Sequence, residues 1–329
     1  MCGIAGFTRL SNSVNRGVGR RITEALFHRG PDQQGVFEGS EMTLCAVRLK
    51  IIDLGGGDQP ILSDDEDTAI AFNGEIYNHR EIRAELEALG HRFHSHCDTE
   101  TVLHAYLQWD TECFTRMRGM FAVALWTESR RRLVLVRDRM GIKPLYYYRT
   151  GDDIYFGSEL KAIFEHPGLP RRLDLEALDS YLSVNYVPGP NTLIEGIKKV
   201  PPGHLLEWQH GKMKIERWWE PAAREKSIHT LDSAKEELDR LLRDAVREHL
   251  VADVPLGVWA SGGLDSSAIL HYAATQNAGQ LKTFSVSFAG RTFDESPYFR
   301  EIARVYGTDH HEFDLNPDVE LRSAIEDFA

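Results

Sequence analysis

The chain has 329 residues, of which 42% are apolar and 27% are charged, a balance typical of globular proteins. Because this length exceeds what one ordinary hydrophobic core organises, we expect two domains. The formal net charge of −12 argues against non-specific binding to nucleic acid or to anionic membranes, since both need a basic surface.

The sequence has no visible leader and no membrane span. No basic segment precedes a long apolar run at the amino terminus, and no apolar stretch approaches the ~20 residues that a membrane helix needs. The four cysteines, Cys2, Cys45, Cys97 and Cys113, form no CxxC pair and indicate no disulfide framework. We therefore expect a cytoplasmic protein.

Short strands are expected over the first ~205 residues, because short apolar or alternating runs are separated by Gly, Pro, Asn and Asp. These runs lie at 4–7, 43–52, 68–72, 120–126, 133–137 and 145–148. Two helices are expected among them, one after a capping box at 78–81 with Gly90 as its stop, and one from about 99 to 109. This pattern predicts a sheet-rich, layered α+β domain.

The pattern changes after a polar, linker-like stretch at 221–230. The expected elements are a helix behind a capping box at 233–236, a strand at 254–260, a helix at 266–276, a strand at 283–288, a helix at 297–306, a strand at 311–315 and a helix from 317. Strands that alternate with helices predict a parallel α/β sheet.

Cys2 follows the initiator methionine directly, and its small side chain permits removal of Met1. The new terminal residue would carry both a thiol and an α-amine, and an amine with a pKa near ~8 can act as the base for that thiol. Position alone also fits an unreactive cysteine in a buried strand, so the neighbouring motifs carry the argument.

Five short motifs occur in order: MCGIAGF (1–7), HRGPD (28–32), RL with IID (48–53), FNGEIYN (72–78) and DTE (98–100). Each is weak alone, but the ordered set is specific. Together they resemble the class II glutamine amidotransferases, and among these the asparagine synthases most closely. The resemblance implies an N-terminal nucleophile fold with αββα layers over residues 1–215, in which Cys2 hydrolyses glutamine.

The resemblance also implies roles for other residues. The Asn73 amide and the Gly74 backbone N–H would stabilise the tetrahedral oxyanion, where loss of one donor typically costs ~10²–10³ in rate. Glycine also suits a turn that approaches the substrate closely. Arg48 would bind the α-carboxylate of glutamine, while Asp98, with Glu75 nearby, would receive its α-ammonium.

Structural alternatives remain for these charged residues. Arg48 also fits a surface charge at a strand edge, Asp98 fits the N-cap of the helix that follows it, and Glu75 fits a turn. His28 and Arg29 are expected to shape the loop over the site rather than to act on the substrate.

A cluster of potential metal ligands occupies residues 91–98: His91, His94, His96, Cys97 and Asp98. The segment reads as a helix stop followed by a short strand, where neighbouring side chains point to opposite faces. Cys97 and Asp98 could then not easily share one ion, so we expect no metal there.

A second motif, SGGLDSS at 261–267, lies between an expected strand and an expected helix. Such a turn aims N–H groups and hydroxyls at an anion, yet it lacks the lysine of a Walker A loop. It resembles the pyrophosphatase-type loop of synthetases that adenylate a carboxylate, and VPLGV at 254–258 strengthens the similarity to asparagine synthases.

The loop resemblance implies an ATP site at the carboxyl edge of a parallel sheet, with Leu256 and Val286 enclosing the adenine and ribose. The residues implied are Leu256, Ser261, Gly262, Gly263, Leu264, Asp265, Ser266, Ser267 and Val286. Asp265 is the expected ligand of Mg²⁺-pyrophosphate, because Mg²⁺ prefers carboxylate and phosphate oxygens. Asp294 and Glu295 are further candidates for this pocket.

Taken together, the resemblances imply an ATP-dependent carbon–nitrogen ligase that makes asparagine. Ammonia from glutamine would pass through an internal passage to β-aspartyl-AMP, formed from aspartate and ATP with release of pyrophosphate. Two alternatives stay open: an amidotransferase acting on another carboxylate, and a glutaminase-only or regulatory protein. A homodimer is compatible with the resemblance, and no nucleic-acid or membrane partner is expected.

The sequence ends inside an expected helix, whereas members of this family continue with further strands. We therefore expect residues 216–329 to form the N-terminal part of a synthetase domain, in either a fragment or a natural truncated form. The acceptor pocket would then lie beyond residue 329, and this chain would release ammonia without making asparagine.

Overall fold

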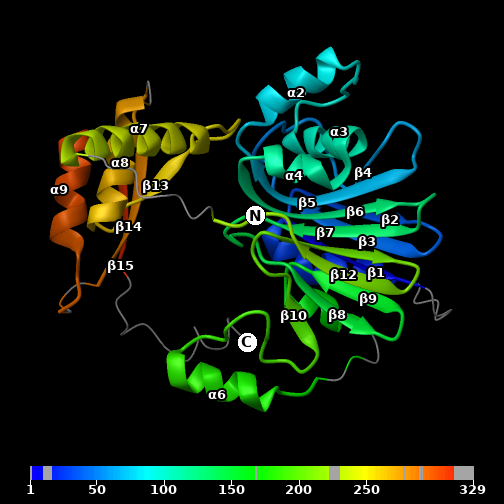
Figure 1. Cartoon of the computed structure of the whole chain (residues 1–329). Coiled ribbons are helices and arrows are strands. Elements are labelled where there is room, and N and C mark those ends of the chain that lie inside the picture. Colours follow the sequence, from blue (N-terminus) through cyan, green and yellow to red (C-terminus); the bar gives the residue numbers. More distant parts are fainter. Residues whose placement is uncertain are drawn as a thin grey trace. The chain divides into compact units, whose positions relative to one another are not determined.

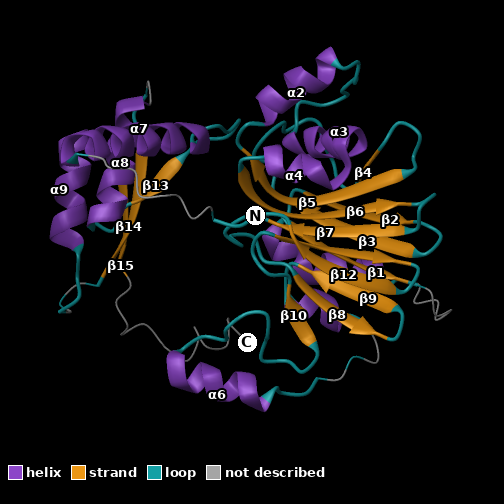
Figure 2. Ribbon diagram, in the orientation of Figure 1, coloured by secondary structure: helices purple, strands orange, loops and turns teal. Residues whose placement is uncertain are grey.

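The computed structural model describes residues 2–9, 17–166, 169, 171–221, 230–276, 279–288, 290 and 292–314 (Figure 1). Contacts divide the chain into two compact units, Met1–Ala223 and Arg224–Ala329. The first unit is built on two antiparallel sheets and the second on a parallel one (Figure 2). In the described residues, no helix is both long and apolar enough to cross a membrane.

One sheet of the first unit has the strand order β10-β8-β9-β1-β3-β2. Its strands are β1 (Gly3–Thr8), β2 (Gln33–Glu38), β3 (Met42–Arg48), β8 (Tyr146–Thr150), β9 (Asp153–Gly157) and β10 (Ile197–Lys199). The strands β1 and β3 are buried along their whole length, whereas the edge strand β2 alternates between half-buried and exposed residues. A continuous apolar run thus marks a strand that is covered on both faces.

The other sheet has the order β12-β11-β7-β6-β5-β4. Its strands are β4 (Ile61–Leu62), β5 (Thr68–Ile76), β6 (Gly119–Thr127), β7 (Arg132–Arg137), β11 (His204–Gln209) and β12 (Lys212–Arg217). Side chains from both sheets form one buried cluster, which includes Ile4 and Leu44 from one sheet and Trp126 and Trp208 from the other. The two sheets therefore face each other across a common core.

Helices cover the outer faces of the two sheets. The helices α1 (Val18–Leu26) and α5 (Leu160–Phe164) pack on the first sheet. The second sheet is covered by α2 (His79–Ala88), α3 (Asp98–Trp109) and α4 (Cys113–Arg116) (Figure 2). The remaining helical segments are η1 (Phe27–Arg29), η2 (Asp110–Glu112) and α6 (Leu175–Val184). These layers confirm the predicted αββα arrangement.

The second unit contains a three-stranded parallel sheet of order β13-β14-β15. Its elements are α7 (Leu231–His249), β13 (Gly257–Trp259), α8 (Leu264–Gln276), β14 (Lys282–Ser287), α9 (Ser296–Tyr306) and β15 (Asp309–Asp314). A small apolar cluster that includes Val246, Leu270 and Leu281 joins its helices to the sheet. The parallel α/β prediction is confirmed, while the helix expected from 317 lies outside the described residues.

Neither expected capping box forms as predicted, although Asn78 does stand at the N-cap position of α2. The Asn78 side chain makes no cap; its Nδ2 donates to Arg116 O (3.0 Å), and its Oδ1 accepts from Arg118 N (2.8 Å). The helix α7 begins earlier than expected, because Thr230 is its N-cap and accepts from Ser233 N. A tertiary contact overrides the local signal in the first case, and a better cap upstream does so in the second.

Gly6 tests how closely β1 packs in the first unit. A Cβ at this position would lie 2.5 Å from Thr43 O and 2.7 Å from Phe156 Cζ. We expect Gly6→Ala to destabilise the first unit by ~1–3 kcal/mol, measured by urea unfolding followed by tryptophan fluorescence. Gly55→Ala is the matched control, because a Cβ there meets nothing within 4 Å. Equal unfolding midpoints for the two variants would contradict this packing.

Candidate active site

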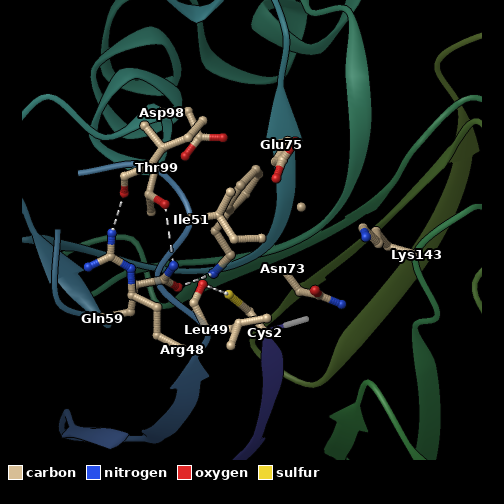
Figure 3. A pocket seen from close by; sticks show the side chains of 13 residues that line it. Cys2, Arg48, Leu49, Ile51, Gln59, Asn73, Glu75, Asp98, Thr99 and Lys143 are labelled. Carbon is tan, nitrogen blue, oxygen red and sulfur yellow. Dashed lines mark hydrogen bonds between the residues drawn. The ribbon is translucent and has the colours of Figure 1, made fainter. Parts of the chain in front are cut away.

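A pocket in the first unit gathers most of the residues expected to act on glutamine (Figure 3). It lies where β1, β3 and β5 meet the loop after β3 and the start of α3. Its lining residues are Cys2, Arg48, Leu49, Ile51, Ile52, Gln59, Phe72, Asn73, Gly74, Glu75, Asp98, Thr99 and Lys143. Thus Cys2, Arg48, Asn73, Gly74, Glu75 and Asp98 come together as the sequence predicts.

Cys2 lies half-buried immediately before β1, and both its side chain and its backbone make contacts. Its Sγ is 3.7 Å from Leu49 O, and Arg29 Nε donates to Cys2 O at 3.0 Å. Arg29 is fixed in turn by Glu159, whose Oε1 lies 2.8 Å from Arg29 Nη1 and 2.9 Å from His28 Nε2. The HRG segment therefore positions the backbone of Cys2, in keeping with the shaping role expected of it.

Burial raises the pKa of the Cys2 thiol above its ordinary value. A thiol is a weak nucleophile until it is deprotonated, so this site needs a base or a nearby cation to produce the thiolate.

Arg48 ends β3 and is 5% exposed, so it is not a surface charge at a strand edge. Its guanidinium donates to the carbonyl oxygens of Ile52 (2.8 Å), Asp53 (3.1 Å) and Gly56. Arg48 thus holds the loop that follows β3 in place. Its Nη1 also lies 3.5 Å from Asp58 Oδ1, and because arginine has five N–H donors, one is left for a further acceptor in the pocket.

The strand β5 extends past its neighbour β4, which pairs only with Ala69 and Ile70. Beyond that point, side chains take over the role of the missing strand. The N–H of Phe72 donates to Gln59 Oε1 (2.7 Å), and the N–H of Ile76 donates to Asp98 Oδ2 (3.0 Å). Alternate residues of a strand direct their N–H groups to the same side, so Gly74 N–H lies between these two on the pocket edge.

The residue opposite Gly74 confirms this direction. Phe121 in β6 donates its N–H to Asp138 Oδ2 (3.2 Å) and accepts Asp138 N–H at its carbonyl (2.8 Å). Phe121 therefore directs its backbone groups away from β5. In an antiparallel pair of this kind, the opposing residue also directs its N–H outward. The Gly74 amide is consequently available to the pocket.

Gly74 was expected in a turn, but it lies within β5. The expected strand at 68–72 continues to Ile76, which also removes the alternative of Glu75 as a turn residue. A Cβ at Gly74 would lie 2.2 Å from Met120 O and 2.7 Å from Phe121 Cα. Glycine is thus required by the close approach of β6, which the sequence pattern did not reveal.

Asn73 is 1% exposed, and neither Oδ1 nor Nδ2 of its amide has a hydrogen-bond partner among the described residues. Figure 3 places this side chain beside Cys2. Leaving buried polar atoms unpaired costs ~1–3 kcal/mol each, so such groups in a native structure call for an explanation. A ligand in the pocket that accepts from Nδ2 would supply one.

Asp98 is not the N-cap of α3. Cys97 holds that position, and its Sγ accepts from Glu100 N (3.4 Å). Asp98 is 6% exposed and points its carboxylate to the pocket edge of β5. Burial, together with the charge of Glu75, raises the pKa of Asp98 to about 6 against the opposing effect of the Ile76 N–H. A cation in the pocket would favour the charged carboxylate.

Three pocket residues, Gln59, Thr99 and Lys143, were not assigned a role from sequence. Gln59 is 3% exposed and bridges β5 to α3 through Phe72 N and Thr99 Oγ1 (3.3 Å). Lys143 is 5% exposed, and burial lowers its pKa. The residue type of a glutamine or lysine in a loop does not indicate that its side chain is buried. Only the packing of these loops against the paired strands brings Gln59 and Lys143 to the pocket.

The segment 91–98, where no metal ion was expected, contributes to packing and to hydrogen bonds. Within the described ranges, no group of three or more His, Cys, Asp or Glu side chains is arranged to hold a metal ion. His94 Nε2 lies 3.0 Å from Asp64 Oδ1, and His91 Nδ1 lies 3.0 Å from His104 Nδ1.

The glycine-rich loop of the second unit lies between β13 and α8, as expected. Ser261 Oγ accepts from Gly263 N (3.3 Å) and lies 3.0 Å from Ser266 Oγ. Gly262 has a φ of +83°, and a Cβ there would lie 2.7 Å from Phe299 N. The loop is therefore held close to the first turn of α9. Asp265 belongs to the first turn of α8.

Leu256 does not join this loop. It precedes β13 and lines a different hollow with Leu250, Leu281 and Lys282, at the amino ends of the strands. The register pairs Gly257 with Lys282, which puts Leu256 level with Leu281. Val286 lies about five residues beyond Leu281 along the sheet, so it is roughly 16 Å from Leu256. The expectation that Leu256 and Val286 enclose one adenine is therefore wrong, and Ala260 occupies the carboxyl end of β13 instead.

Asp294 forms hydrogen bonds with nearby residues of its own turn. Its carboxylate accepts from Ser296 N (3.2 Å), Ser296 Oγ (2.7 Å) and Phe288 N (3.3 Å). It therefore serves the turn before α9, and Glu295 stands at the N-cap position of that helix without a side-chain cap bond.

Comparison with known proteins agrees with this geometry. Residues 1–219 match the family model of the glutamine amidotransferase domain, and residues 237–328 match that of asparagine synthase. Glutamine-hydrolysing asparagine synthetase 3 of Bacillus subtilis is 35% identical over 330 residues, covering 94% of this chain and 54% of that protein. Asparagine synthetase 1 of the same organism is 37% identical over 301 residues, covering 91% and 47%. The chain spans about half the length of the curated relatives it matches.

Among solved structures, the glutamine phosphoribosylpyrophosphate amidotransferase of B. subtilis superposes with a TM-score of 0.52 at 16% identity. The match covers 95% of this chain and 90% of that one. At this identity the likeness concerns the fold alone.

The raised pKa of Asp98 makes a prediction about stability. Because the folded-state pKa of about 6 exceeds the unfolded value of ~3.9, the contribution of Asp98 to stability is full below pH ~4 and is lost as pH rises through about 6. Asp98→Asn keeps an acceptor for Ile76 N without the charge. We expect it to stabilise the ligand-free protein by up to ~3 kcal/mol at pH 7.5 and by little at pH 4.

Urea unfolding at a series of pH values measures this difference. Destabilisation by Asp98→Asn to the same extent at every pH would show that Asp98 is held as a structural carboxylate, and this account of its burial would be wrong.

Proposed function

The chain belongs to the glutamine amidotransferase family, and we propose that its first unit hydrolyses glutamine to glutamate and ammonia with Cys2 as the nucleophile. One observation carries the proposal: beside Cys2, the Asn73 amide is buried with no partner in the described part of the chain, and Gly74 N–H faces the pocket. These are the donors that an oxyanion formed at Cys2 requires.

The reaction begins with attack of the Cys2 thiolate on the side-chain amide carbon of glutamine. The carbonyl oxygen becomes an oxyanion, which accepts from Asn73 Nδ2 and Gly74 N–H. Collapse of the tetrahedral intermediate breaks the carbon–nitrogen bond, and the nitrogen takes up a proton and leaves as ammonia. Water then cleaves the Cys2 thioester, which yields glutamate and restores the thiol.

The base for this reaction is the α-amine of Cys2, made available by removal of Met1. An α-amine has a pKa near ~8, so much of it is unprotonated at the pH where the reaction must run. Because burial raises the pKa of the thiol, the reactive thiolate forms only when a base beside it takes up the proton, and the α-amine is that base.

Glutamine is recognised through its charged ends. Arg48 binds the α-carboxylate with donors that the loop carbonyls leave available, while Asp98 and Glu75 receive the α-ammonium. Ammonium binding restores the charge of Asp98, whose pKa burial has raised to about 6. Binding of glutamine near that pH should therefore release a proton.

We further propose that the ammonia serves the ATP-dependent amidation of aspartate to asparagine, in a protein with residues 1–215 as glutaminase and 216–329 as part of the synthetase. Two asparagine synthetases among the relatives support this, as does the SGGLDSS loop at the carboxyl end of β13. The ATP-binding residues are then Ser261, Gly262, Gly263, Leu264, Asp265, Ser266, Ser267 and Val286.

Asp265 would hold a Mg²⁺ ion, because a carboxylate in the first turn of α8 stands next to the proposed phosphate loop, and the ion would supply charge to neutralise the phosphates. The reducing cytosol is the proposed location, where the four free cysteines remain thiols.

The glutaminase proposal is tested by ammonia release from glutamine. We expect Cys2→Ala to abolish release, and Cys45→Ala to retain it, because Cys45 is fully buried in β3 away from the pocket. Mass spectrometry of the purified protein should show that Met1 is absent. Ammonia release by Cys2→Ala at the wild-type rate would exclude Cys2 as the nucleophile.

Removal of the proposed oxyanion donor has a separate signature. We expect Asn73→Ala to lower kcat/KM ~10²–10³-fold without lowering the melting temperature, because the amide has no partner to lose among the described residues. A variant with normal kcat/KM but a lower melting temperature would show that Asn73 serves the fold instead.

A further inference from the structure

A buried lysine belongs to the glutaminase pocket, although neither the oxyanion nor the recognition of glutamine accounts for it. Lys143 is 5% exposed and lines the pocket together with Cys2 and Glu75. In Figure 3 its side chain lies on the side of the pocket opposite Arg48, beyond Asn73. An ammonium is strongly hydrated in water, so burying it requires nearby negative charge.

The backbone of Lys143 is fixed on both sides. Its N–H donates to Asp138 Oδ2 (2.9 Å), and its carbonyl accepts from Arg137 Nε (2.9 Å). The same oxygen of Asp138 accepts from Phe121 N, the residue paired with Gly74. The buried carboxylate of Asp138 therefore connects the backbone of Lys143 to β6, the strand that pairs with the proposed oxyanion donors in β5.

The charges around Lys143 come from several elements. Glu75 in β5 and the Cys2 sulfur favour its charged form, as does Asp138 below it, while Arg29 in η1 opposes it. Electrostatic interactions are mutual, so an ammonium that a thiolate at Cys2 stabilises also stabilises that thiolate. Three other charges act on Cys2: the amino-terminal ammonium and Arg48 favour the thiolate, and Asp98 opposes it.

We propose that Lys143 is a positioning residue for the hydrolysis: its ammonium, whose charged form the nearby Glu75 favours, stabilises the negative sulfur of Cys2 on the Asn73 side of the pocket. The proposal rests on the proposed glutaminase function. Lys143 touches neither the leaving group nor the oxyanion; it acts through the sulfur. The α-amine of Cys2 removes the proton, and Lys143 determines how readily the resulting thiolate persists in a buried site.

Alkylation of Cys2 by iodoacetamide measures the thiolate without any turnover. The other three cysteines are at most 1% exposed, and Cys2→Ala gives the background. We expect Lys143→Met to move the alkylation midpoint upward by about one pH unit or more, which slows alkylation at least about tenfold below the thiol pKa. The rising limb of kcat/KM for glutamine should move in the same direction.

Lys143→Arg should restore most of the alkylation rate, because it keeps the positive charge. If Lys143→Met does not fold, Lys143→Gln retains a polar end group for the same comparison. The matched control is Lys199→Met: Lys199 is half-buried, its Nζ donates to Val187 O (3.0 Å), and it lies outside the pocket. We expect it to leave the alkylation midpoint unchanged.

Two results would overturn the proposal: a midpoint for Lys143→Met equal to that of the wild type, or an arginine variant no better than the methionine variant. A wild-type protein whose Cys2 is alkylated normally but which releases no ammonia would refute the glutaminase function instead. In that case the alkylation midpoints still decide whether Lys143 acts on the thiol.

Discussion

The pocket depends on one constraint, which is that β5 runs past the end of its neighbour β4. Buried backbone N–H groups must find acceptors, and within the described ranges no strand supplies them on the β4 side of β5 beyond Ile70. Gln59 and Asp98 provide two acceptors at Phe72 and Ile76. Gly74 lies between these two residues, so its backbone N–H is the one on this edge of β5 that is directed at the proposed substrate. Gln59 thereby joins the end of the loop after β3 to β5, and Asp98 joins the start of α3 to it.

The same edge explains why so many polar groups are buried in a small volume. Arg48, Asn73 and Asp98 are all less than one-tenth exposed, and each faces the pocket. Burial raises the pKa of Asp98 to about 6 and leaves the Asn73 amide without a partner among the described residues. A fold selected for stability alone would not keep these features, whereas a site that must bind charge and stabilise an oxyanion needs them.

Local sequence predicted the elements better than their ends. Apolar runs located β1, β3 and β5 because strands covered on both faces contain few polar residues. The continuation of β5 to Ile76 depends instead on the side chains of Gln59 and Asp98, which lie outside any local window around that strand. The helix caps illustrate the same limit: Asn78 has the right type for a cap, yet its amide bonds the segment at 116–118.

The sequence by itself determined the αββα class, the parallel second sheet and the motifs that carry Cys2, Asn73, Gly74 and Asp98, because chain order and residue type are enough to recognise them. Only the tertiary structure decided which groups are buried and where they point. It brought Lys143 to Cys2, placed Leu256 at the wrong end of β13 for the phosphate loop, and made Cys97 the cap of α3. Burial and direction follow from strand register between residues far apart in the chain, which no local pattern encodes.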